Sequence, residues 1–202
     1  LPEGDIELPP ELQPFLGIAE SVAETEILTQ KLLLLLVSMD GIGGVLVRGF
    51  HPDAVRSALR HLQEMEFTIE MVKGCSMGCD PSRPEEFCPR CRLDYEYDRM
   101  EIVEEKLPVV FLPRNVTLEA LRGSLFVNYV VRPNLLTRAH RGILFVEDID
   151  LLDYEIESAL ASALSTGKNT IERNGTVVEQ PCRIMLIATQ NDPEAELHPL
   201  IN

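Results

Sequence analysis

Two adjacent carboxylates, Glu147 and Asp148, stand at the end of an apolar run and could hold a metal ion. The run, residues 143–146, consists of Ile, Leu, Phe and Val, which is typical of a strand buried on both faces of a parallel sheet. Ligands of such sheets bind beyond the carboxyl ends of the strands. There, one acid can hold Mg²⁺ while the next orients the water that attacks a phosphate. A plain core strand followed by a solvated acidic turn is the alternative, because short apolar runs are ambiguous.

The segment that would bind the phosphates of a nucleotide has the expected layout. A short apolar strand at residues 45–47 precedes a turn at Gly49, and a helix is predicted from Asp53 to Met65. Strand, glycine turn and helix follow one another in the Walker A loop of nucleotide-binding proteins. That loop also needs glycines, whose backbone N–H groups wrap the phosphates, a Lys for the terminal phosphates and a Ser or Thr for Mg²⁺.

The residues of this loop fail those requirements in a first register. With Gly49 as the first glycine, the other glycine positions hold Pro52 and Ala54. The lysine position then holds Val55, which carries no charge, and the hydroxyl position holds Arg56. Pro52 also lacks a backbone N–H group, so it cannot donate a hydrogen bond to a phosphate.

A second register is no better. Shifted by one residue, the loop places Arg56 and Ser57 at the Lys–Ser pair, but Phe50 and Val55 then replace the glycines. Arginine can bind phosphate through its permanent charge, yet it does not restore the missing N–H groups. We therefore expect Gly49, Arg56 and Ser57 to mark an ATP site that is weak or lost.

Four of the five cysteines lie close together, with the spacing C-x3-C-x8-C-x2-C. They are Cys75, Cys79, Cys88 and Cys91. Four thiolates on one short loop could enclose a tetrahedral Zn²⁺ ion, and the C-x2-C half has the spacing of a ligand pair. Reduced structural cysteines and a redox-sensitive pair are the alternatives. Cys182, which precedes an apolar strand, is expected to be buried and free of metal.

The elements that must position these residues form an α/β pattern with a parallel sheet, because apolar runs alternate with helical segments. The expected strands lie near residues 45–48, 108–112, 143–147 and 184–189. The last strand would bring Asn191 to the edge that carries the two acids, where an amide suits contact with a γ-phosphate or its water. Asn-Asp-Pro is equally a common turn.

Other local signals predict two helices and a hairpin. Ser21 and Glu24 form a capping-box pattern near the start of a helix over residues 22–39. A second helix is expected from Asp153 to Leu164. Asn174 and Gly175 predict a two-residue turn between the strands of a hairpin spanning residues 171–178.

A chain of 202 residues suits one domain with a sizeable core. Residues 1–16, rich in Pro and acids, are predicted to be an irregular lead-in, and residues 17–202 the core. Residues 74–106 form an acidic, cysteine-rich insertion, whose part from 94 to 106 is expected to be a solvated surface excursion. The chain begins on Leu1 and shows no closing helix, as expected of an excised piece without a C-terminal lid.

The net charge of −15 argues against non-specific binding to nucleic acid or to an anionic membrane. The longest apolar run, residues 32–37, is too short to span a bilayer, and no signal-peptide pattern is present. Clustered cysteines favour a local metal or redox site over a secreted disulfide framework. A reducing compartment such as the cytoplasm is therefore expected.

Five passages, in order along the chain, carry a resemblance to a known family: IGGVLVRG, the cysteine loop, LPVVFLPRNVTLEALRGSL, NLLTRAHRGILFVEDIDLLD and STGKNTIERNGTVVEQPCRIMLIATQNDPEAELHPL. Together they resemble the AAA+ module of the magnesium chelatase I and D subunits, which insert Mg²⁺ into protoporphyrin IX. The resemblance implies a three-layer P-loop NTPase (AAA+) fold with a mainly parallel central sheet. It also implies (bacterio)chlorophyll biosynthesis for photosynthesis, in the cytoplasm or a plastid stroma, by an ATP-dependent ligase that forms N–metal bonds. The implied partners are an active AAA+ subunit, assembled with this chain in a hexameric ring, and a catalytic porphyrin-binding subunit.

The departures from the family pattern concern the nucleotide site. The active I subunit has an intact Walker A loop, and its Walker B reads Asp-Glu where this chain has Glu147 and Asp148. Its next Asn is Asp150 here. Exchanging the two acids shifts each carboxylate by about one methylene, which is enough to misplace a metal or water. Degenerate sites of this kind, and the LIATQN strand, resemble the D subunit, so the chain is interpreted as a D-type N-terminal domain.

Three hypotheses follow. The first is a non-hydrolysing AAA+ domain that assembles with active subunits in a ring and binds no ATP or Mg²⁺ by itself. The second is a weakly active ATPase subunit of a magnesium or cobalt chelatase, using Arg56 with Glu147 and Asp148. The third is a zinc-binding scaffold on a relic ATPase core.

Overall fold

The computed structural model describes residues 25–32, 44–49, 52–123, 133–173, 175–192 and 194–199. The chain divides into two compact units. One comprises residues 1–37 and 49–65, and the other residues 38–48 and 66–202. The predicted lead-in at 1–16 and the capping-box pair Ser21 and Glu24 lie outside the described residues.

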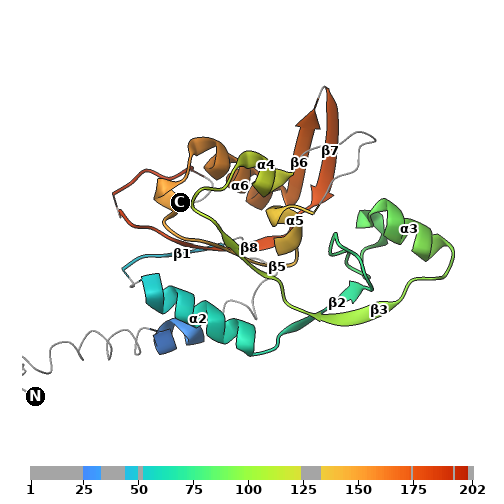
Figure 1. The fold of residues 1–202 in the computed structure, drawn as a ribbon, viewed down its shortest axis with the longest axis horizontal. Helices are drawn as coiled ribbons and strands as arrows, with labels where there is room; N and C mark the ends of the chain where they lie inside the picture. Colours follow the sequence, from blue (N-terminus) through green and yellow to red (C-terminus); the bar gives the residue numbers. More distant parts are fainter. Residues whose placement is uncertain are drawn as a thin grey trace, which may run out of the picture. The chain divides into compact units, whose positions relative to one another are not determined.

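The larger unit is built on a four-stranded, all-parallel sheet with the strand order β1-β8-β5-β4 (Figure 1). Its strands are β1 (Gly44–Val47), β4 (Val109–Leu112), β5 (Gly142–Val146) and β8 (Ile184–Thr189). All four strands predicted from apolar runs are therefore confirmed, within a residue or two at their ends. β5 lies between β8 and β4 with all its residues buried, as expected of the central strand.

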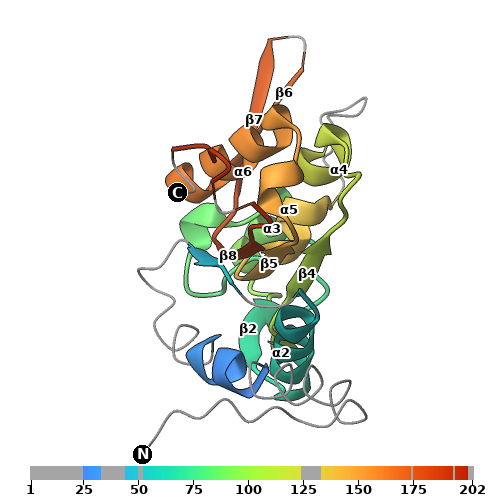
Figure 2. The same cartoon turned by 90° about the vertical axis from the view of Figure 1, so that its left-hand side faces the viewer.

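Helices α4 (Leu118–Arg122), α5 (Leu135–Ala139) and α6 (Tyr154–Thr166) lie on one side of this sheet in both ribbon views (Figures 1 and 2). Alternate strand residues, among them Leu144 and Leu186, pack with these helices in one apolar core. Ile143 and Ile187, which point to the opposite face, are buried as well. Burial on both faces explains why these strands are continuous apolar runs, as parallel strands are.

An antiparallel ribbon of β2 (Thr68–Val72) and β3 (Ile102–Lys106) carries the cysteine-rich segment. That segment contains the short helix η1 (Pro84–Glu86) and helix α3 (Pro89–Glu96). Residues 94–106 are largely exposed, as expected, but they are more ordered than the sequence suggested. The two ribbon strands were not predicted, because their mixed and acidic residues lack an apolar run.

The predicted hairpin is present as β6 (Lys168–Arg173) paired with β7 (Thr176–Pro181). Arg173 pairs with Thr176, and Gly175 has φ of +77°, which suits a two-residue turn that needs left-handed residues. The hairpin extends beyond α6 (Figure 2). The short helix η2 (Ile149–Leu151) links β5 to α6.

The smaller unit contains a helical segment at residues 25–32 and helix α2 (Pro52–Glu64). The first lies within the predicted helix 22–39, whose other residues are not described. Helix α2 confirms the helix expected from Asp53 to Met65. Apolar residues at helical spacing on α2, including Ala54, Val55 and Leu59, are fully buried.

Candidate functional site

The two acids lie at the carboxyl edge of the sheet, immediately after β5. Asp148 has a left-handed backbone (φ 48°, ψ 63°), which turns the chain out of the strand and into η2. Its backbone N–H donates to the Thr189 hydroxyl at 2.9 Å, so the end of β5 is tied to the end of β8. Both carboxylates are largely buried, with 14% of the Glu147 side chain and 10% of the Asp148 side chain exposed.

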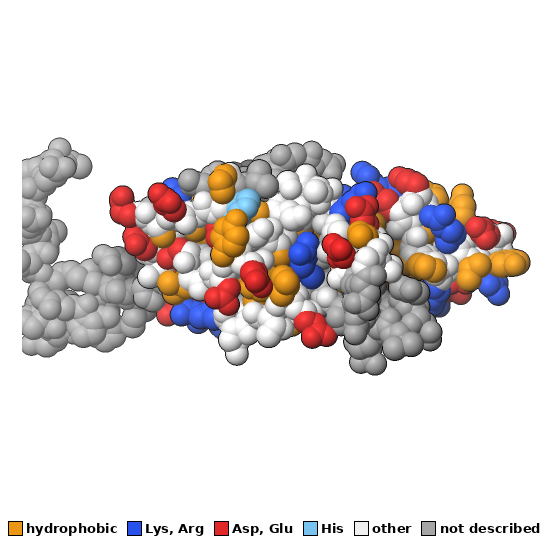
Figure 3. All heavy atoms as spheres, turned by 90° about the horizontal axis from the view of Figure 1, so that it is seen from above, with side chains coloured by type: hydrophobic (Ala, Val, Ile, Leu, Met, Phe, Trp, Pro, Cys, Tyr) orange, Lys and Arg blue, Asp and Glu red, His pale blue; other side chains and the backbone are white. Residues whose placement is uncertain are grey.

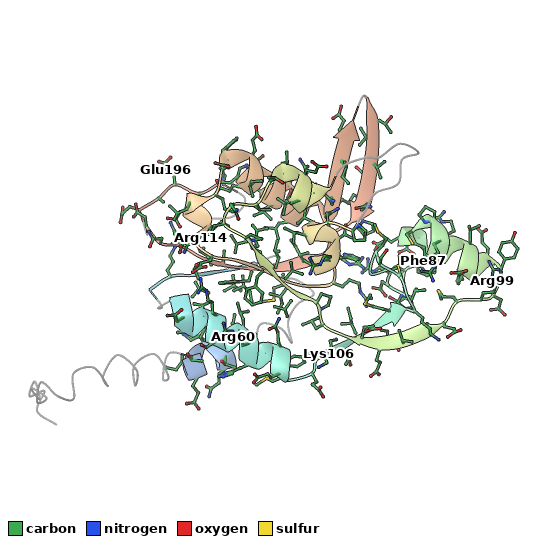
Figure 4. All side chains as sticks on the ribbon, viewed as in Figure 1. Arg60, Phe87, Arg99, Lys106, Arg114 and Glu196 are labelled. Carbon is green, nitrogen blue, oxygen red and sulfur yellow. The ribbon has the colours of Figure 1, made fainter. Side chains whose placement is uncertain are left out.

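Arg114, which lies two residues beyond β4 and is labelled in Figure 4, pairs with both acids. Its Nη2 donates to Asp148 Oδ2 at 2.5 Å and lies 3.4 Å from Glu147 Oε1. A charge-assisted bond of this kind satisfies a carboxylate that would otherwise be costly to bury. Arg114 was not predicted from the sequence, although its place after a neighbouring parallel strand puts it at the same edge.

Other polar groups at this edge are held by bonds within the chain. Asp150 accepts from the backbone N–H groups of Asn191 and Asp192, at 2.8 and 3.0 Å. Gln190 accepts from Arg48 Nε at 2.6 Å. Asn191, the predicted contact for a γ-phosphate, reaches the expected edge, where its backbone closes a turn on Asp150 and the residue is exposed.

The candidate phosphate-loop residues lie at the start of α2 in the smaller unit. Val55, which takes the lysine position in the first register, is fully buried. Arg56 and Ser57 are half-buried, and Arg56 lies 3.8 Å from Asp53 one turn earlier. Gly49 has φ of +76° and open space around its Cα, so it keeps the conformational freedom of a loop glycine.

These residues do not fit a bound nucleotide with Mg²⁺. The helix begins at Pro52, which offers no N–H group to a phosphate. In the larger unit, the acids that would hold the metal already share the guanidinium of Arg114. A metal ion at this edge would therefore compete with Arg114 for the two acids.

The four clustered cysteines converge. The sulfur atoms of Cys75, Cys79, Cys88 and Cys91 all lie within 4.8 Å of one another. Cys75 Sγ and Cys88 Sγ are 4.0 Å apart, and no described cysteine forms a disulfide. The sequence prediction that these four residues share one site is met in geometry, whereas the metal itself stays a prediction.

The thiols also perturb one another electrostatically. Hydrogen bonds from the Cys79 and Cys88 thiols hold the pKa of Cys75 below its usual value, so one thiolate is favoured within the group. Burial, with the neighbouring sulfurs, raises the pKa of Cys91 to about 12. Cys182 stands apart from this group; it is buried, its Sγ is 3.8 Å from the Leu136 carbonyl oxygen, and burial raises its pKa to about 12.

The cysteine segment is anchored to the amino edge of the sheet through Asp80. Arg141 Nε and Arg183 Nη2 lie 3.5 and 3.2 Å from Asp80 Oδ2. These arginines immediately precede β5 and β8, so the segment lies at the edge opposite the two acids. Arg183 also pairs with Glu86 at 2.5 Å.

The buried His140 is part of the same contact. Its Nδ1 accepts from the Arg183 backbone N–H at 3.0 Å. Gly78, with φ of +67°, packs so closely that an added Cβ would lie 3.4 Å from the imidazole. Burial, followed by the charges of Arg183 and Arg141, lowers the pKa of His140 to about 4.

Residues 105–197 match the family model described as "Magnesium chelatase, subunit ChlI". The chain is 34% identical over 179 residues to the magnesium-chelatase subunit ChlI homolog of Methanocaldococcus jannaschii, which covers 85% of this chain and 48% of that protein. The chain is a relative of the magnesium chelatase I subunits. The chloroplastic magnesium-chelatase subunit ChlI of Oryza sativa subsp. indica is 32% identical over 197 residues, covering 93% of this chain and 47% of its own length.

A solved structure supports the same relationship. It is the complex between subunits BchI and BchD of magnesium chelatase, one chain of which matches with a TM-score of 0.65 and 31% identity. The match covers 84% of this chain and 53% of that one. The expected α/β fold of AAA+ type, with a mainly parallel sheet, is thereby confirmed.

The similarity covers only part of each relative. The chain spans about half the length of the curated relatives it matches. The relatives named above carry I-subunit names, so the resemblance to D subunits stays a prediction. No described helix is long and apolar enough to cross a membrane.

Proposed function

We propose that this chain is a non-hydrolysing AAA+ domain of a magnesium chelatase. In this role the domain binds no ATP by itself and assembles in a ring with an active ATPase subunit of the I type. A third, porphyrin-binding subunit then inserts Mg²⁺ into protoporphyrin IX. The proposal places the domain in (bacterio)chlorophyll biosynthesis, in the cytoplasm or in a plastid stroma.

The observation that carries the proposal is the pairing of Arg114 with both acids. A hydrolytic site needs those carboxylates for Mg²⁺ and for water. Here one guanidinium already pairs with both carboxylates, with one contact of 2.5 Å and another of 3.4 Å. A divalent cation would have to displace this arginine before it could bind.

The start of α2 supports the same conclusion from the phosphate side. Each charge-assisted contact that a phosphate loop loses is worth about 1.5–3 kcal/mol. Losing the lysine and several loop N–H groups removes as much as the whole binding free energy of a micromolar ligand, about 8 kcal/mol. We therefore expect no measurable affinity of the wild-type chain for ATP.

The burial of Val55 decides which register of the loop should be restored. A lysine at this fully buried position would bury an unpaired charge, so the first register is a poor choice for engineering. The second register places the lysine at the half-buried Arg56, followed by Ser57. The matching changes are Phe50→Gly, Pro52→Ala, Val55→Gly and Arg56→Lys, combined with Arg114→Gln to free the acids.

The test is calorimetric titration with a non-hydrolysable ATP analogue and Mg²⁺. The wild type, the loop variant, Arg114→Gln and their combination are compared, with Arg60→Ala as a control on the exposed side of α2. Thermal unfolding establishes that each variant is folded, because Val55→Gly removes a buried side chain. We expect micromolar binding from the combined variant alone. Micromolar binding by the wild type would instead support the weak-ATPase alternative.

A further inference from the structure

The end of the β2–β3 ribbon has a very small core, and cysteines make up most of it. Its buried members are Val72, Cys75, Cys79, Phe87 and Cys91. Phe87, labelled in Figure 4, packs edge-on against Tyr95, whose residue is half exposed. So few apolar side chains rarely hold a segment in one conformation without a disulfide or a metal. The described cysteines form no disulfide.

We propose that Cys75, Cys79, Cys88 and Cys91 bind one structural Zn²⁺ ion. In a tetrahedral site with Zn–S bonds of about 2.3 Å, neighbouring sulfurs lie about 3.8 Å apart. The four Sγ atoms here lie within 4.8 Å of one another, and one pair is 4.0 Å apart. Contraction of the sulfur–sulfur distances by at most about one ångström therefore completes the coordination shell.

Backbone groups around the sulfurs favour thiolates, the form that binds zinc. The N–H of Met77 points to Cys75 Sγ at 3.4 Å, and the N–H of Cys88 points to Cys79 Sγ at 3.2 Å. Cys88 is the N-cap of α3 and Cys91 lies in its first turn. The amino end of a helix carries partial positive charge, which stabilises nearby thiolates.

Four protein ligands leave no open coordination position, so the site is structural rather than catalytic. It also lies at the sheet edge opposite Glu147 and Asp148, because Asp80 in the same segment contacts Arg141 and Arg183 at the amino ends of β5 and β8. Zinc would thus fix the ribbon end in the form that these two arginines hold. This inference does not depend on the proposed function.

Metal analysis of the whole chain, purified without chelator from zinc-containing medium, tests the proposal. We expect one zinc ion per chain in the wild type and in Cys182→Ser, whose thiol lies outside the cluster. Cys91→Ser, which removes the most buried ligand, should lose most of the zinc. Titration with Co²⁺ should give the absorption of a tetrahedral tetrathiolate complex in the wild type and in Cys182→Ser.

A second measurement serves in case a cysteine variant does not fold. The wild type is alkylated under native conditions with and without a zinc chelator, and the labelled residues are located by mass spectrometry. The chelator should expose the four cluster cysteines to labelling. Equal labelling in both conditions, a disulfide among the four, or iron in place of zinc would each overturn the proposal.

Discussion

At the scale of single residues, the chain keeps acids in the place of a catalytic pair but gives them a different partner. Glu147 and Asp148 could be predicted from sequence because an apolar run leads directly into them. Arg114 could not be predicted in the same way, since nothing in the residues around it indicates that β4, the strand it follows, lies beside β5. The structure places Arg114 on both carboxylates.

The cysteine cluster was easier to predict, because the ligand spacing itself carries the signal. What the spacing could not give is the anchor to the sheet. Asp80 is one acid among 33 Asp and Glu residues, and only the fold brings it to Arg141 and Arg183. Figure 3 shows how acidic and basic side chains are mixed on one face of the molecule, so charge alone does not reveal such pairs.

His140 makes folding stability depend on pH. Its pKa falls from 6.5 to about 4 in the folded chain, because it is buried and lies near Arg141 and Arg183, whose effect outweighs that of Asp80. As pH falls below 6.5, His140 becomes protonated in the unfolded chain but stays neutral in the folded chain, where its pKa is about 4. Stability is therefore full above this pH and is lost progressively towards pH 4, by about 2 kcal/mol near pH 5 from this residue.

Denaturant unfolding of the wild type and of His140→Gln, near neutral pH and near pH 5, measures this effect. The glutamine does not titrate and can still accept the Arg183 N–H. Both proteins keep the cysteine cluster, so any loss of stability through that cluster cancels in the comparison. A loss between the two pH values that is equal in both proteins would contradict the prediction.

At the scale of elements, the sequence predicted the strands that are continuous apolar runs and the hairpin that has a recognisable turn. The four parallel strands and the hairpin at Asn174 and Gly175 follow from buried runs and from turn chemistry. The ribbon strands β2 and β3 do not, because they are largely exposed and β3 reads IVEEK. Their pairing depends on the anchored segment between them rather than on local propensity.

Gly142, which has no Cβ, allows β5 to approach closely the residue that precedes β4. A Cβ at this position would lie 2.1 Å from the Pro108 carbonyl oxygen and 2.8 Å from Pro108 Cβ. Pro108 directly precedes the edge strand β4, and its carbonyl oxygen accepts from the Ile143 N–H at 2.8 Å, so the sheet would have to separate there. We expect Gly142→Ala to lower the free energy of unfolding by about 3 kcal/mol or more.

The matched control is Gly175→Ala in the hairpin turn. Gly175 has a left-handed backbone, with φ of +77°, and nothing lies within 4 Å of the Cβ that an alanine would add. Its cost is therefore backbone strain alone, about 1–2 kcal/mol. Equal losses in urea unfolding of the two variants would show that the close approach at Gly142 is relieved at little cost.

At the scale of the whole molecule, the residues expected from sequence to mark a nucleotide site are divided between the two compact units. The candidate phosphate-loop residues lie at the start of α2 in one unit, and the acids lie in the other. The family relationship was predicted from passages spread along the chain, in order, and the comparisons bear it out. The ring and the division of labour within it rest on the proposal above.

Assembly with an active partner is the last prediction. The chain is mixed with the ATPase-active I-type chelatase subunit of the same organism, with and without ATP and Mg²⁺, and the mass of the complex is measured by light scattering. Because the wild-type chain is expected to bind no nucleotide, assembly should require only the partner's nucleotide. Wild type and Arg114→Gln should therefore assemble equally, whereas a partner whose Walker lysine is replaced should not assemble. A mixed complex that forms only with the restored loop variant would show that this domain needs its own nucleotide, and the non-hydrolysing role would then be wrong.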